Sequence, residues 1–182
     1  MRRYWKYLLA SGLYLSLNAC TPSSSAVEVK NPAVDWSLVF ASWQEGCRDS
    51  EIFSQLSEHL YNYPEDAVAP QKGFIQLPDY LKASVDPEIE IEDHEESRSF
   101  IVNVKNGQYY GMKLNKIVVY AGKGNGINGR YIEVEQSDAQ LRDFLKKVKF
   151  ERDWSNPSEY GHDQAILEVQ DQHIKIACDN SM

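Results

Sequence analysis

The 182-residue sequence lacks an apolar run long enough to cross a membrane as a helix. Its most apolar stretch, residues 7–17, includes Ser11 and Ser16 and falls short of the about 20 apolar residues that a membrane-spanning helix needs. Internal repeats are also missing, and the Ser-rich segment 21–30 is the one stretch of biased composition. We therefore expect neither a transmembrane helix nor a repeat architecture.

Catalytic and metal-binding motifs are missing as well. The patterns H-E-x-x-H and G-x-S-x-G and the EF-hand loop do not occur. The histidines are scattered and do not combine with cysteines at zinc-site spacing: His59, His94, His162 and His173. We predict that the protein is not an enzyme and uses no metal or other cofactor. A hydrolase whose site has no recognisable motif is the remaining alternative.

One glycine pattern resembles a nucleotide-binding motif but has the wrong context. Residues 124–129 satisfy G-x-G-x-x-G. In dinucleotide-binding proteins a helix follows this loop at once, because its N-terminus holds the pyrophosphate. Here residues 130–135 alternate like a strand, and Lys123 does not complete a P-loop. The glycines therefore predict a β-hairpin connection with Asn-Gly turns and no nucleotide ligand.

Basic residues are fewer than acidic ones. The chain has 19 Lys and Arg against 27 Asp and Glu, and its formal net charge is −8. An acidic surface repels nucleic acid and anionic lipid, and it attracts cationic proteins. We therefore expect no nucleic-acid partner. Two interpretations stay open: the charge recognises a basic protein partner, or it only keeps the protein in solution.

The N-terminus has the three parts of an export signal. Arg2, Arg3 and Lys6 form a positive segment, residues 7–17 are apolar, and Leu17-Asn18-Ala19-Cys20 places small residues before a cysteine. This arrangement resembles the lipobox of bacterial lipoprotein precursors. The resemblance implies a signal peptide over residues 1–19, which is removed once the Cys20 thiol is acylated. An ordinary cleaved signal with an incidental cysteine is the alternative.

The same resemblance implies a location. In this class, Asp after the modified cysteine favours the inner membrane, and here that position is Thr21. We therefore expect a cell-envelope protein on the outer membrane that faces the periplasm. Each buried CH₂ of an acyl chain contributes about 0.8 kcal/mol to the free energy of bilayer binding. The lipid alone would therefore make the membrane contact. Residues 20–34 are expected to form a flexible tether, and residues 35–182 a single domain.

The cysteines other than Cys20 are Cys47 and Cys178. In an oxidising compartment two such cysteines favour a disulfide. Two buried thiols are the alternative. The bridge would connect the front of the domain to its last strand.

The periodicity of apolar residues predicts an α+β domain, with N-terminal helices packed on an antiparallel sheet and one inserted helix. Ser137 and Gln140 form a capping box for that inserted helix, and Asn106 and Gly107 predict a turn after the strand from Phe100. An apolar strand over 38–41 is the alternative to the first helix. We expect helices at about 35–43, 49–62 and 138–148, and strands at 74–77, 88–92, 100–104, 116–121, 130–135, 165–169 and 174–178.

Three groups of residues are candidates for contact with a protein partner. The first is the tip of the glycine-rich loop 122–130, the second a pair of tyrosines expected in a turn, and the third a dense acidic stretch around His94. That stretch lacks calcium-site spacing. The candidates are Lys123, Asn125, Ile127, Asn128 and Arg130; Tyr109 and Tyr110; and Glu92, Asp93, Glu95 and Glu96.

Location, charge and the missing catalytic motifs together favour a lipid-anchored binding protein of the cell envelope. We expect it to occlude a basic protein, as an inhibitor or immunity protein acting on a cationic hydrolase or toxin. The alternative is an accessory or structural lipoprotein of an envelope assembly.

Overall fold

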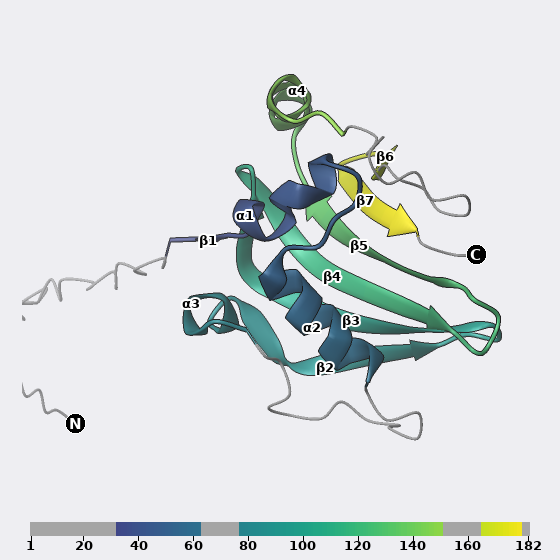
Figure 1. The fold of residues 1–182 in the computed structure, drawn as a ribbon. Coiled ribbons are helices and arrows are strands. Elements are labelled where there is room, and N and C mark those ends of the chain that lie inside the picture. The colour runs from purple at the N-terminus through teal and green to yellow at the C-terminus, as the bar shows by residue number, and fades with distance from the viewer. Residues whose placement is uncertain (1–31, 63–76, 151–164, 180–182) are drawn as a thin grey trace, which may run out of the picture. The chain divides into compact units, whose positions relative to one another are not determined.

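The computed structural model describes residues 32–62, 77–150 and 165–179 (Figure 1). Residues from Pro32 onward belong to one compact unit. The predicted signal peptide, Cys20, nearly all of the tether and most of the strand expected over 74–77 lie outside the described residues. Val34, which the sequence assigns to the end of the tether, already pairs with Gly107 of the sheet.

The domain is built on a seven-stranded sheet. Its order is β1-β3-β4-β5-β7-β6. Strand β2 also pairs with β3, along the same edge of β3 as β1. Every pairing is antiparallel except that of β1 with β3, so the sheet is mixed and not purely antiparallel as predicted. The strands are β1 Val34–Asp35, β2 Val85–Asp93, β3 Ser97–Tyr109, β4 Met112–Gly122, β5 Asn128–Glu135, β6 Ile166–Gln170 and β7 His173–Asp179.

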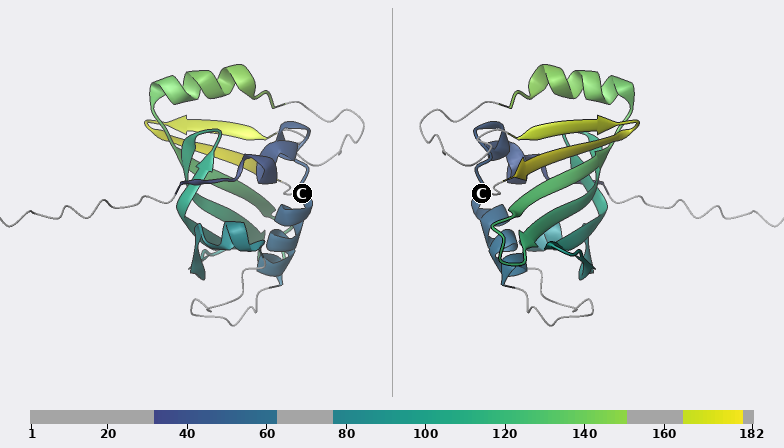
Figure 2. Two further views of the ribbon diagram at one scale, coloured as in Figure 1. Left: turned by 90° about the vertical axis from the view of Figure 1, so that its left-hand side faces the viewer. Right: turned by 90° about the vertical axis from the view of Figure 1, so that its right-hand side faces the viewer.

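Helices contribute less than strands to this α+β fold. The described helices are α1 Ser37–Phe40, the 3₁₀ helix η1 Ala41–Gln44, α2 Glu51–Tyr61, α3 Asp79–Lys82 and α4 Asp138–Lys147. Figure 2 shows α2 lying against one face of the sheet and α4 beyond the β6–β7 hairpin. The predicted capping box of α4 is present, with Ser137 and Gln140 exchanging hydrogen bonds. Leu145 is 48% exposed, whereas Phe144 and Val148 are buried in the core.

One face of the sheet forms the core together with the N-terminal helices. Alternate strand residues such as Val102, Ile117 and Ile132 point into a single apolar cluster with Phe40 and Phe53. Because successive strand residues face opposite sides, this alternation is what the sequence pattern predicts. Aromatic rings fill the space between helices and sheet, with the Phe40 and Trp43 centroids 4.9 Å apart.

The prediction of a turn at Asn106 and Gly107 is wrong. Strand β3 continues through both residues to Tyr109, and its register against β4 shifts between Asn103 and Gly107. The chain turns instead at Tyr110 and Gly111, which both have positive φ, as a tight hairpin turn requires. Gly107 is needed for close packing, because a Cβ there would lie 3.1 Å from the ring of Trp36.

This β-bulge also overturns the prediction for Tyr109. From Asn103 to Gly107 β3 advances four residues, while β4 advances two. Across this irregularity the core-facing positions of β3 change phase, from Val102 and Val104 before it to Tyr109 after it. Tyr109 therefore points into the core and is 0% exposed. Its ring packs near Phe40 and Phe144. Tyr109 is a core residue, and it does not offer a contact surface.

We expect Tyr109→Phe to leave the free energy of unfolding unchanged or to raise it by about 1 kcal/mol. The Tyr109 hydroxyl is buried and has no hydrogen-bond partner among the described residues, and such an unsatisfied group costs free energy. Denaturant unfolding measures the change. Tyr110→Phe is the matched control, because the Tyr110 hydroxyl accepts a hydrogen bond from Nε2 of Gln44 at 2.8 Å. A loss above about 1 kcal/mol in Tyr109→Phe would contradict this assignment.

Candidate functional site

Two of the predicted contact segments meet at one end of the sheet. Ser97, at the start of β3, pairs with Gly122, at the end of β4. This pairing places the acidic turn after β2 beside the glycine-rich loop after β4. We call residues 92–96 and 123–127 together the hairpin end (Figure 1, at the right of the view).

Hydrogen bonds join the two segments directly. The backbone nitrogen of Lys123 and the side-chain Nδ2 of Asn125 both donate to the carbonyl of Glu96, each at 2.9 Å. The Lys123 ammonium forms an ion pair with Asp93 at 2.6 Å. The acidic turn and the glycine-rich loop are therefore one surface, although the sequence suggested them as separate candidates.

The loop between β4 and β5 is shorter than predicted, because β4 extends to Gly122 and β5 begins at Asn128. Gly124 and Gly126 have φ values of 83° and 74°, which side chains other than glycine adopt only with strain. Oδ1 of Asn125 accepts a hydrogen bond from the backbone nitrogen of Ile127 at 3.2 Å. The loop is thus held both by its own turn and by the neighbouring hairpin.

The carboxylates of the hairpin end are of two kinds. Asp93 is paired with Lys123 and, at 3.4 Å, with Arg98. The hydrogen bond from Lys123, followed by that from Arg98, lowers the pKa of Asp93 below its ordinary value. Glu95 and Glu96 are exposed and form no ion pair within the described part of the chain. They give this end an uncompensated negative charge.

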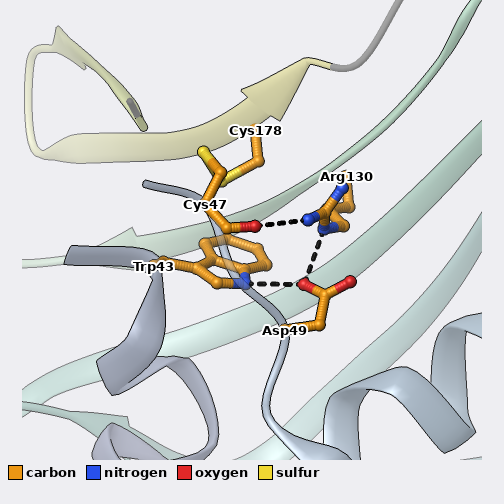
Figure 3. Close-up of a disulfide and its surroundings, with 5 residues drawn as sticks. All are labelled: Trp43, Cys47, Asp49, Arg130 and Cys178. Atoms are coloured by element: carbon orange, nitrogen blue, oxygen red, sulfur yellow. Dashed lines mark hydrogen bonds and ion pairs between the residues drawn. A yellow bond between two sulfur atoms is a disulfide. The ribbon is translucent and has the colours of Figure 1, made fainter. Parts of the chain in front are cut away.

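Arg130 does not lie at the loop tip, and its prediction as an exposed contact residue is wrong. It is 6% exposed, because its side chain follows Ile132 and Val134 on the inward face of β5. Nε donates to Oδ1 of Asp49 at 2.8 Å, and Nη2 donates to the carbonyl of Cys47 at 2.6 Å (Figure 3). The guanidinium carbon also lies 5.9 Å from the centre of the Trp43 ring.

Asp49 completes this buried group. Its Oδ1 accepts a second hydrogen bond, from Nε1 of Trp43 at 3.1 Å. Burial raises the pKa of Asp49, and the positive charge of Arg130 opposes this effect. We call Trp43, Cys47, Asp49 and Arg130 the arginine cluster.

The predicted disulfide is confirmed. Cys47 and Cys178 are bonded, with their Cα atoms 5.7 Å apart and a sequence separation of 131. Cys178 pairs with Arg130 across β7 and β5, so the bridge lies next to the arginine cluster. Closing so long a loop stabilises the fold by up to about 5 kcal/mol in the chain-entropy account.

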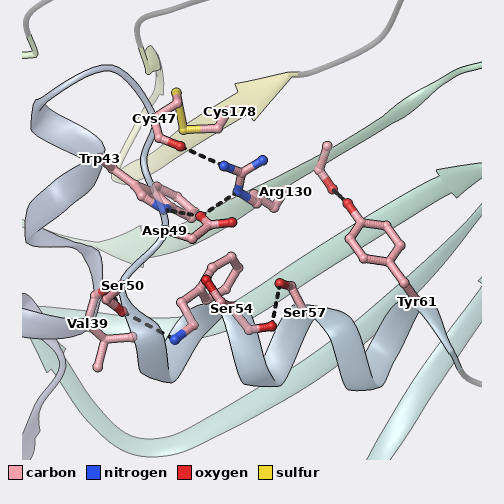
Figure 4. Close-up of polar contacts among 12 residues, drawn as sticks. Val39, Trp43, Cys47, Asp49, Ser50, Ser54, Ser57, Tyr61, Arg130 and Cys178 are labelled. Carbon is pink, nitrogen blue, oxygen red and sulfur yellow. Dashed lines mark hydrogen bonds and ion pairs between the residues drawn. A yellow bond between two sulfur atoms is a disulfide. The ribbon is translucent and has the colours of Figure 1, made fainter. Parts of the chain in front are cut away.

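A groove lies between α2 and the glycine-rich loop, on both sides of Tyr61. One part has a volume of about 500 Å³ and is lined by Tyr61, Arg98, Phe100 and residues 121–124. The other, about 480 Å³, is lined by Asp49, Tyr61 and Arg130 together with loop residues. Tyr61 is 39% exposed, and its hydroxyl donates to the carbonyl of Gly129 at 3.4 Å (Figure 4).

The tyrosine pair is not part of this site. Tyr109 and Tyr110 are at the far end of β3, roughly 40 Å from the hairpin end at about 3.3 Å per residue. Tyr110 is half-buried and packs against Phe144 of α4. The remaining loop candidates, Ile127 and Asn128, are partly exposed and lie beside the groove.

Asp49, Tyr61 and Arg98 are site residues that the sequence interpretation missed. Tyr61 looks like any residue at the end of an amphipathic helix, and Asp49 like a helix-start residue. The arginines did carry a signal, since Arg98 and Arg130 stand at positions that strand alternation assigns to the inward face. A charge at such a position needs a buried partner.

Comparisons with protein-family models, with curated proteins and with solved structures find no match for this chain. Among the described residues, no group of three or more His, Cys, Asp and Glu could hold a metal ion. In the same part of the chain, no helix has the length and apolarity that crossing a membrane requires.

We expect Arg130→Met to lower the free energy of unfolding by about 3 kcal/mol. The change leaves the Asp49 carboxylate largely buried without its charged partner. Asp49→Asn should cost a similar amount, because the amide oxygen still accepts hydrogen bonds but leaves the buried charge of Arg130 unpaired. The double variant should show a coupling of at least about 1 kcal/mol in denaturant unfolding under oxidising conditions.

The control for this pair is Lys113→Met, which breaks an exposed ion pair with Glu135 of 2.9 Å. It should cost less than about 1 kcal/mol. A cost of Arg130→Met no larger than that of Lys113→Met would contradict a structural role for the arginine cluster.

Acidification should break the Lys123–Asp93 ion pair only below the ordinary pKa of aspartate. Because the pKa of Asp93 is lowered from 3.8 in the folded state, its link to Lys123 is complete above that pH. The link is lost as the pH falls through the folded-state pKa. NMR shifts of the Lys123 and Asn125 amides should report this titration, and Asp93→Asn should abolish it. A midpoint at or above 3.8 in the unsubstituted protein would rule out the pairing.

Proposed function

We propose that the protein is a lipid-anchored binding protein of the cell envelope, which uses the hairpin end to occlude a basic protein. An inhibitor or immunity protein acting on a cationic hydrolase or toxin fits this description. The observation that carries the proposal is the junction of the acidic turn with the glycine-rich loop through Lys123, Asn125 and Glu96. A charged surface and a projecting loop at the same place suit a partner that has a basic rim around a cleft.

The distribution of charge supports a basic partner. Many of the described Lys and Arg side chains are in ion pairs, including Lys113, Lys116, Lys123 and Arg130. The exposed Glu95 and Glu96 are not. Complementary charge mainly speeds association and selects partners. The negative end of the protein would therefore meet a cationic surface first.

The fixed conformation of the loop supports occlusion. Ordering a flexible loop on binding costs free energy, and a loop that is already held avoids much of that cost. Lys123 and Asn125 tie the loop to the acidic turn before any partner arrives. Such a loop can enter a cleft and block it without catalysis, a cofactor or a nucleotide.

The envelope location rests on the lipobox-like stretch that ends in Cys20. The Cys47–Cys178 disulfide supports it, because disulfides persist in the periplasm and are rare in the cytosol. Acyl chains on Cys20 would hold the protein at the outer membrane, with the domain in the periplasm.

A role as an accessory lipoprotein of an envelope assembly is favoured by a different observation. Strand β6 pairs only with β7 among the described strands, and it exposes Ile166 and Val169. An exposed apolar edge strand can accept a strand from another protein. This surface would serve a salt-insensitive association.

The test is partner capture by the full-length protein, purified in detergent from membranes of its own cells. Glu95→Gln with Glu96→Gln should weaken capture of a basic protein by about three- to tenfold, since exposed charge pairs contribute up to about 1 kcal/mol each. Raising the salt concentration should likewise weaken capture by the unsubstituted protein, because salt screens exposed charges. Mass spectrometry of the same preparation checks for acylated Cys20.

Glu45→Gln with Glu51→Gln is the matched control, because both residues are exposed and lie outside the hairpin end. If both double variants captured the partner equally well, the hairpin end would not be the contact surface. Salt-insensitive capture of a membrane complex would favour the accessory role instead.

A further inference from the structure

The arginine cluster has two atoms that its internal hydrogen bonds leave unused. Both hydrogen bonds to Asp49 end on Oδ1, and Arg130 donates through Nε and Nη2. Within the described residues, Oδ2 of Asp49 and Nη1 of Arg130 make no hydrogen bond. The side chains of Arg130 and Asp49 keep 7% and 22% of their surface exposed, and both line the groove.

These two atoms face the groove. Asp49, Arg130 and Tyr61 all line its part of about 480 Å³. In Figure 4 the second oxygen of Asp49 and the remaining nitrogen of Arg130 point to the side on which Tyr61 lies. The groove therefore presents one hydrogen-bond acceptor and one donor next to each other, on side chains fixed by the cluster.

The chemistry of this pair selects a neutral ligand group. A cation would approach the guanidinium of Arg130, and an anion would approach the carboxylate of Asp49, so either would meet a like charge. A group that carries a donor and an acceptor side by side satisfies both atoms at once. The primary carboxamide of an Asn or Gln side chain has this arrangement, with an N–H for Oδ2 and a C=O for Nη1. The N–H and C=O of one residue in an extended peptide also point to the same side.

The walls of the groove suit an extended peptide. Gly122, Gly124 and Gly126 line this part and have no side chains, so a ligand can lie close to the backbone. Tyr61 and Ile127 add apolar surface. Pockets of several hundred Å³ that combine apolar walls with a few fixed polar groups are typical of specific binding sites.

We infer that the groove receives a peptide segment of the protein partner and that an amide of this segment binds between Oδ2 of Asp49 and Nη1 of Arg130. The inference rests on the proposed function in that the partner is a protein. It assigns the arginine cluster a binding role in addition to its structural one. The acidic turn then attracts the partner, and the groove recognises its main chain or an Asn or Gln side chain.

The test is an NMR titration of the full chain in detergent micelles with N-acetylglycinamide. We expect saturable shifts of the Arg130 Nε–H signal and of the amides of residues 122–128. Acetate, methylguanidinium and glucose at equal concentrations present an anion, a cation and hydroxyl groups, and they should not produce these shifts.

Asp49→Asn should reduce the affinity for N-acetylglycinamide about tenfold, because it replaces the accepting Oδ2 by a donating amide nitrogen. Glu95→Gln with Glu96→Gln should leave it unchanged, because these residues lie outside the groove. The ligand comparison on the unsubstituted protein decides the matter even if Asp49→Asn does not fold.

Stronger shifts with glucose, acetate or methylguanidinium, or shifts that Asp49→Asn leaves intact, would overturn the inference. So would the absence of saturable shifts with N-acetylglycinamide.

The two proposals fail separately. Loss of the amide response with partner capture still sensitive to Glu95 and Glu96 removes the groove assignment alone. An intact amide response with capture insensitive to those residues removes the hairpin-end function alone.

Discussion

Arg130 brings a positive charge to the inward face of β5, where Ile132 and Val134 on the same face are apolar. A buried guanidinium is tolerated only when its charge and its donors are satisfied. Asp49 supplies the charge and the Cys47 carbonyl a further acceptor, and both lie on the segment between η1 and α2. The chain before α2 is therefore held against the sheet by a polar contact inside an apolar core.

Several other features depend on that contact. The disulfide joins the same segment to β7, directly beside Arg130. Helix α2 begins at Glu51, capped by Ser50, immediately after Asp49. The position of Asp49 thus sets where α2 starts, and α2 carries Tyr61 at its other end to the groove. The opposite wall is set independently, because the glycine-rich loop is tied to the acidic turn by Lys123 and Asn125. A groove between two walls that are each fixed by their own contacts does not need a ligand to form.

The parts of this structure that local sequence signals describe were predictable. The capping box of α4 and the apolar runs of β6 and β7 need only neighbouring residues, and the structure has all three elements close to the expected places. The predicted alternation does not describe the burial of β6, where both Ile166 and Val169 are exposed. The bulge in β3 was not predicted, because Asn106 and Gly107 carry a local turn signal, whereas the structure packs Gly107 close to Trp36, which is distant in the sequence. Its consequence is that Tyr109 lies in the core. The disulfide followed from the cysteine content and the expected compartment, and not from any local pattern.

The candidate site shows the same division between local and distant causes. Composition identified the acidic turn and the glycine loop, but only strand pairing shows that they are adjacent. Asp49 and Arg130 are 81 residues apart, so no local pattern could join them. Alternation along β5 nevertheless marks Arg130 as inward-facing, which conflicts with its assignment to the loop tip. A charged residue in phase with the core is better interpreted as half of a buried pair, with its partner to be found elsewhere in the chain.

The separation of charge from hydrogen-bonding groups at this end of the domain has a functional consequence. Exposed carboxylates such as Glu95 and Glu96 act over distances up to the screening length of about 8–10 Å, but they discriminate poorly between cationic surfaces. The Asp49–Arg130 pair is electrically neutral as a unit, so it contributes little attraction at a distance. At contact it demands one donor and one acceptor in a defined geometry, and a ligand that lacks either leaves a charged atom unpaired. In the proposed binding mode, attraction and selection therefore reside in different residues of the same surface, and each could change without loss of the other.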